Sequence, residues 1–311
     1  EALDANTTAS DHVAVGYQAL TANTTGDSNI AIGSGALASN TTGNVNVAMG
    51  YQALNANTTA ANNVAVGYQT LLSNTTGTQN VAVGVSALDA LVSGDKNVAV
   101  GTNALGSQST SDGSETFNTA VGHRAGAGTT SGTLNTFIGG EAGDNNTTAG
   151  RNTVVGYQAG YNNTIGQFNV LMGYRAGYRN TGVGSIGDAN VFLGYQAGLD
   201  NQANNNVGIG NGSMGSNTSG TFNVAVGQGS LSANTTAANN VALGVGSLAS
   251  NTTASNNTAV GYQALYTSST ASNNTAVGYQ SGFSHTTGAA NVSLGYGSLS
   301  NNTTASNNTA L

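Results

Sequence analysis

The sequence predicts an all-β fold, a parallel β-solenoid (β-roll) of about seventeen coils with 17 residues in each coil. A short phrase of the type Val-Ala-Val-Gly recurs along the chain, its spacing is nearly constant, and its apolar residues alternate instead of following a helical period. The glycine that ends the phrase stands at positions 16, 33, 50, 67, 84, 101, 122, 139, 156, 173, 194, 210, 227, 244, 261, 278 and 295.

The spacing predicts one repeat array over residues 1–311. Most intervals between these glycines are 17 residues; two are 21 residues and one is 16. A fixed period of this size is typical of supersecondary units that stack on their neighbours. We expect regular coils in 1–116 and 201–311 and a variant band in 117–200, bracketed by insertions at 106–117 and 179–190.

Columns of equivalent positions indicate how each coil is built. An asparagine stands four residues before almost every repeat glycine, a β-branched residue three before it and an aliphatic residue one before it. The last two columns share strand parity, and the mostly Ala column between them points to the other face. We expect the aliphatic columns to be buried and the Ala column to form a flat outward stripe. Another copy of the chain could approach that stripe closely, which predicts a homo-oligomer.

Seventeen residues suffice for two short strands and two turns per coil. The repeat glycine is expected to adopt a conformation closed to other residues, and stacked Asn side chains to satisfy backbone groups of the turns. These structural positions are represented by Asn46, Asn63, Asn80, Asn97, Gly50, Gly67 and Gly84.

Composition excludes several classes of protein. There are 46 Gly and no Pro, Cys or Trp, and charged residues make up 5% of the chain, against about 25% in ordinary domains. The net charge of -7 argues against a nucleic-acid partner. The lack of Cys removes thiolate metal sites, and no apolar run reaches the length of a membrane span. His12, His123 and His285 occupy different coil positions, so we expect no catalytic, cofactor or metal site.

A tyrosine often follows the repeat glycine, and such rows could contact sugars or stack on one another. Tyr157, Tyr174 and Tyr195 in the variant band, with Arg124 and Arg175, are the candidate contacts for a glycan or protein receptor. Arg124 and Glu141 share a column and are expected to be neighbours on adjacent coils.

The variant band also differs in its apolar columns. Gly replaces Leu four residues after the repeat glycine, while the Ala column becomes Phe137, Val154, Leu171 and Phe192. This pattern suggests that bulk has moved from one face of the coil to the other.

Asn-Thr-Thr corners match the acceptor pattern for N-glycosylation, although turn chemistry also explains their regular placement. The candidate acceptors are Asn23, Asn40, Asn57, Asn74, Asn234 and Asn251.

Two groups of fibre proteins resemble these repeats. Asn63-Val64-Ala65-Val66-Gly67 looks like the head repeat of YadA-type trimeric autotransporter adhesins, and 273–280 (Asn-Asn-Thr-Ala-Val-Gly-Tyr-Gln) looks like repeats of phage tail fibres. The resemblance implies a left-handed roll and a homotrimer. The 17-residue period departs from the shorter adhesin repeat.

We therefore expect a noncatalytic attachment-fibre segment, the shaft or head of a surface adhesin or tail fibre, on the outside of a cell or virion. Its expected partners are copies of itself and a surface glycan or protein receptor. One alternative is a self-polymerising extracellular filament or matrix protein. Another is a carbohydrate-binding module that uses the Tyr rows. Both ends lie within the repeat phase, which indicates either a piece of a longer array or end-to-end stacking.

Overall fold

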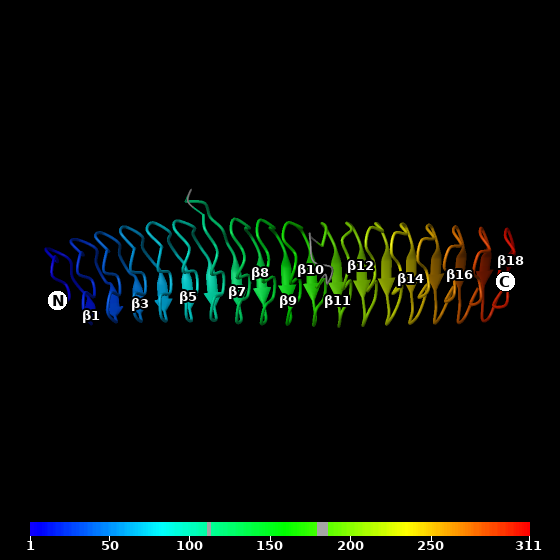
Figure 1. Cartoon of the computed structure of the whole chain (residues 1–311), viewed down its shortest axis with the longest axis horizontal. Helices are drawn as coiled ribbons and strands as arrows, with labels where there is room; N and C mark the ends of the chain where they lie inside the picture. The colour runs from blue at the N-terminus through cyan, green and yellow to red at the C-terminus, as the bar shows by residue number, and fades with distance from the viewer. Residues whose placement is uncertain (111–112, 179–185) are drawn as a thin grey trace. The chain divides into compact units, whose positions relative to one another are not determined.

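The computed structural model describes residues 1–110, 113–178 and 186–311, and the chain divides into two compact units, Glu1–Val155 and Gly156–Leu311. The described residues form an all-β parallel solenoid of about seventeen coils and contain no helix (Figure 1). The prediction of an all-β parallel solenoid of about seventeen coils is confirmed.

Each coil of the first unit contributes one three-residue strand. The strands are β1 (Val13–Val15), β2 (Ile30–Ile32), β3 (Val47–Met49), β4 (Val64–Val66), β5 (Val81–Val83), β6 (Val98–Val100), β7 (Thr119–Val121), β8 (Thr136–Ile138) and β9 (Thr153–Val155). Successive strands pair in parallel and in register, so that Val66 lies opposite Val83 on the next coil. The same register crosses the 21-residue interval between β6 and β7.

The second unit repeats this arrangement. Its strands are β10 (Val170–Met172), β11 (Val191–Leu193), β12 (Val207–Ile209), β13 (Val224–Val226), β14 (Val241–Leu243), β15 (Thr258–Val260), β16 (Thr275–Val277), β17 (Val292–Leu294) and β18 (Thr309–Ala310). Here the parallel pairing of β10 with β11 and of β11 with β12 spans the 21-residue and 16-residue intervals without loss of register.

The prediction of two strands per coil is wrong, because the return halves of the coils consist of turns wherever the structure describes them. In a typical coil, Gln18 and Leu20 have φ angles of 57° and 51°, which an extended strand cannot accommodate. Backbone hydrogen bonds nevertheless continue from coil to coil in this half, as from Leu20 N to Ala36 O at 3.0 Å. The coils are therefore held together on both sides, although only one side is a sheet.

The predicted orientation of the strand faces is also wrong. The Ala column is buried, with Ala48, Ala65 and Ala82 fully inaccessible, whereas the flanking β-branched and aliphatic columns are half-buried or exposed. The interior is narrow because the return half sends a leucine such as Leu54 or Leu71 into it from the opposite side. Only a small side chain fits opposite that leucine. The outward stripe is thus formed by Val, Ile, Met and Thr, and not by Ala.

The variant band keeps the same interior and redistributes its volume. Phe137 and Phe192, in the Ala column, are buried like the leucines of other coils. A Cβ on Gly126 would lie 2.6 Å from Cδ2 of Phe137, and a Cβ on Gly198 would lie 2.5 Å from Cδ2 of Phe192. The predicted transfer of bulk between faces is wrong: both columns point into one core, where a large residue from the strand replaces the leucine of the return half.

The repeat glycines are required by backbone contact. Gly84 has a φ of 131°, and a Cβ there would lie 2.6 Å from the carbonyl oxygen of Gly101 on the next coil. Gly50 and Gly67 have φ angles of 140° and meet the next repeat glycine in the same way. The sharp end of each strand therefore depends on glycine in both conformation and space.

Candidate functional site

The column of asparagines before the strands forms a buried hydrogen-bond ladder. The side-chain oxygens of Asn46, Asn63 and Asn80 accept from the backbone N–H of the next asparagine in the column at 2.9 to 3.0 Å, the last of these being Asn97. The Nδ2 of Asn63 donates to the carbonyl oxygen of Gly77 at 2.9 Å. Each amide thus satisfies one donor and one acceptor of the turns, which leaves no amide group directed at a ligand in these coils.

The Asn-Thr-Thr corners place their asparagines inside the fold. Nδ2 of Asn57 donates to Oδ1 of Asn40 at 2.7 Å and to the carbonyl of Ala60 at 3.1 Å. The six candidate acceptors of glycosylation, Asn23, Asn40, Asn57, Asn74, Asn234 and Asn251, are fully buried. A glycan on these nitrogens is incompatible with the fold, since it would break the ladder and need space that the interior lacks.

The tyrosine rows stack from coil to coil. The rings of Tyr157 and Tyr174 have centroids 5.8 Å apart, and those of Tyr174 and Tyr195 are 5.2 Å apart. The guanidinium of Arg175 lies 5.3 Å from the centroid of Tyr174 and 4.8 Å from that of Tyr178. Both faces of the Tyr174 ring are therefore covered by other rings, and a sugar could meet this ring only at its edge.

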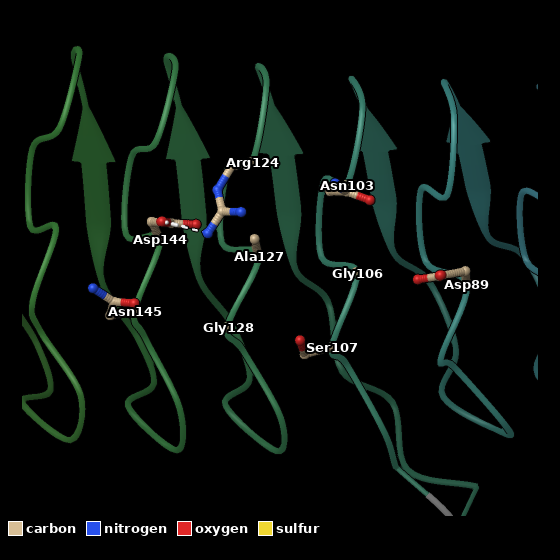
Figure 2. A pocket seen from close by; sticks show the side chains of 9 residues that line it. All are labelled: Asp89, Asn103, Gly106, Ser107, Arg124, Ala127, Gly128, Asp144 and Asn145. Carbon is tan, nitrogen blue, oxygen red and sulfur yellow. Dashed lines mark hydrogen bonds and ion pairs between the residues drawn. The ribbon is translucent and has the colours of Figure 1, made fainter.

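The first unit contains a polar hollow of about 310 Å³, which we call the trough (Figure 2). It follows one column of the return half across the coils of β5 to β8, five residues after each repeat glycine. In this column Asp89 and Asp144 enclose two small residues, Gly106 and Ala127. The remaining lining residues are Asn103, Ser107, Arg124, Gly128 and Asn145.

At one end of the trough, Arg124 pairs with Asp144 (Figure 2). Nη2 of Arg124 lies 2.9 Å from Oδ2 of Asp144, whose side chain is 1% exposed, whereas that of Arg124 is 45% exposed. The other carboxylate oxygen of Asp144, Oδ1, is buried without a hydrogen-bond partner. Glu141 was predicted to be a neighbour of Arg124 on the adjacent coil, and the register of the two coils confirms this. The ion pair of Arg124 with Asp144 was not predicted.

Burial raises the pKa of Asp89 at the other end of the trough, against the lowering effect of the backbone N–H groups of Asp89 and Ala90. Burial likewise lowers the pKa of His285 in the second unit. Among the described residues, no three His, Asp or Glu side chains gather in a group that could hold a metal ion. None of the described segments is a helix of the length and apolarity that a membrane span requires.

No family model matches the chain, and no curated protein sequence matches it. Residues 111–112 and 179–185, which belong to the two predicted insertions, lie outside the described residues. The trough could have been found from the sequence, because two acids in one column flank a pair of small residues. That signal appears only when the positions five residues after each repeat glycine are aligned between adjacent coils.

Proposed function

We propose that the chain is a noncatalytic segment of an extracellular attachment fibre, and that copies of it associate through the outward face of the strands. The observation that carries the proposal is the apolar stripe along that face in each unit. In the first unit it includes Val121 and Ile138, which are 38% and 41% exposed; in the second it includes Leu243, which is 40% exposed.

A stripe of this kind is unusual for a monomer. Monomeric proteins rarely expose contiguous apolar patches larger than a few hundred Å², and here each strand from β1 to β17 adds one outward apolar side chain, beside a second that is Val, Ile or Thr. The strands are short and in register, so the stripe is regular enough to pack against an identical stripe of another copy. Trimerisation is the form of association that the resemblance to fibre proteins favours.

Sedimentation equilibrium tests the proposal directly. We expect a mass three times that of the 30.5 kDa chain, and fibres in negative-stain electron microscopy. The double variant Val66→Lys with Val100→Lys places two charges on the outward face, two coils apart, and should dissociate the assembly. The matched control, Thr42→Lys with Thr76→Lys, places the same charges two coils apart at exposed corners and should leave the mass unchanged. A monomeric wild-type chain would refute the proposal.

A further inference from the structure

We propose that the trough between Asp89 and Asp144 is a binding site for one neutral pyranose sugar. The role of this site in attachment rests on the function proposed above, whereas sugar binding itself does not depend on that function. The site itself is built from one chain, within the first unit.

The buried carboxylate of Asp144 is the strongest indication of a ligand. Its Oδ1 has no hydrogen-bond partner although the side chain is 1% exposed. A buried acceptor without a donor is costly, and native proteins usually satisfy such groups with protein, water or ligand. The group that completes this site must therefore bring a hydrogen-bond donor into the trough.

The charges around the trough select the kind of donor. Arg124 lies 2.9 Å from Asp144, so its positive charge opposes the approach of a metal cation or an ammonium group to that carboxylate. Asp89 and Asp144 together oppose an anion. A neutral ligand with several hydroxyl groups meets neither obstacle, because each hydroxyl can both donate and accept.

The remaining lining residues match the same chemistry. Asn103 and Asn145 each carry an amide group, Ser107 carries a hydroxyl, and Arg124 carries a guanidinium. The volume of about 310 Å³ lies at the lower end of the range of about 300 to 1,000 Å³ for small-molecule sites. A single sugar ring suits this size, with its hydroxyls directed at the two carboxylates.

One substitution should fill the trough without disturbing the fold, because another coil already carries the larger residue at the equivalent position. Ala127 occupies the same column as Leu72, which the solenoid accommodates five residues after Gly67. Ala127→Leu should therefore fold and occupy the hollow. Ala38→Leu makes the same change in the same column, on a coil outside the trough, and is the matched control.

Saturation-transfer difference NMR of the full chain tests the site, with methyl glycosides of glucose, galactose, mannose and N-acetylglucosamine as probes. We expect at least one neutral glycoside to bind, Ala127→Leu to weaken its binding by ~tenfold or more, and Ala38→Leu to leave it unchanged. Asp144→Asn, which removes the carboxylate with little change in size, should also weaken it. If the free sugars bind and the methyl glycosides do not, the result would still support the site and would assign it to free saccharides.

Three results would overturn the inference: no neutral sugar binds, Ala127→Leu binds as well as the wild type, or calcium ions bind in a way that Asp144→Asn abolishes. Glucosamine and glucuronate serve as cationic and anionic probes, and tighter binding of either would contradict the charge argument. Sedimentation of the same samples separates the two proposals. A trimer that binds no sugar refutes only the site, whereas a sugar-binding monomer refutes only the proposed assembly.

Discussion

Phe137 occupies the space that a side chain at Gly126 would need, since a Cβ on that glycine would lie 2.6 Å from Cδ2 of the ring. A Cβ on Gly143 would meet the opposite edge of the same ring. The phenylalanine of one coil thus accounts for glycines on two coils. The interior holds a fixed volume per coil, which either the strand or the return half can fill.

Because Phe137 fills the space next to Gly126 and Gly143, the effects on stability of substitutions at these three positions should be strongly coupled. Phe137→Ala should destabilise the chain by about 3 to 5 kcal/mol through the cavity that it leaves. Combining it with Gly126→Leu and Gly143→Leu should recover much of that loss, because leucines elsewhere in this column have similar φ angles, as Leu37 does at 50° against 59° for Gly126. Urea denaturation of the variants measures the coupling, and strictly additive effects would contradict it.

The asparagine ladder predicts that the substitution of one of its side chains by alanine lowers the stability of the fold markedly. Asn63→Ala leaves the backbone N–H of Asn80 without its acceptor, at about 1 to 3 kcal/mol for this buried group. It also removes one of the two donors to the carbonyl of Gly77, which keeps Nδ2 of Asn74. Thr59→Ala, at an exposed corner of the preceding turn, should stay within about 0.5 kcal/mol of the wild type. Denaturation midpoints compare the two, and equal effects would show that the ladder adds nothing.

The glycines that end the strands differ from glycines elsewhere in the chain. Gly84→Ala combines a φ of 131° with a contact on Gly101, and should cost about 3 kcal/mol or more in stability. Gly106→Ala is the control, because the nearest atom to a Cβ there is 3.4 Å away. Thermal melting should show a large fall for the first variant and little change for the second. Similar melting temperatures would refute the steric role of the repeat glycine.

His285 predicts a loss of stability in mild acid. Burial lowers the pKa of this imidazole in the folded chain, so the unfolded chain binds the extra proton below about pH 6.5. Stability should therefore fall as the pH drops from about 6.5 through the folded-state pKa. Nε2 of His285 lies 3.1 Å from Nδ2 of Asn302, in a column that is mostly asparagine. His285→Asn should remove this part of the pH dependence, and an unchanged stability profile for the variant would contradict the assignment.

Much of the fold could be predicted from the sequence because the same residue types, glycine and asparagine, recur at a nearly constant spacing. The repeat glycines and their asparagines marked the position of every strand of the described chain. The inward face could not be predicted in the same way. Parity separates Ala65 from Val64 and Val66, but it does not say which set is inside. That depends on Leu71, which reaches the core from the return half and leaves room only for alanine.

The candidate site was predicted only in part. Arg124 was singled out as a candidate receptor contact, whereas Asp144, its buried partner, was not. Its burial depends on the neighbouring coils and cannot be read from a single repeat. For the tyrosine rows, sugar contact and stacking on one another were both open from the sequence. The stacking geometry, which covers both faces of Tyr174, depends on distances that a sequence does not contain.

The central claim is that positions one period apart lie directly above one another, and disulfide cross-linking tests it most directly. The chain has no native cysteine, and Val66 and Val83 are outward register partners on adjacent strands. Adjacent strands lie about 4.8 Å apart, within the reach of a disulfide. The account predicts that Val66→Cys with Val83→Cys forms an intrachain bridge under mild oxidation, whereas Val66→Cys with Val100→Cys, two coils apart, does not. Efficient bridging of the second pair, or none in the first, would contradict the account.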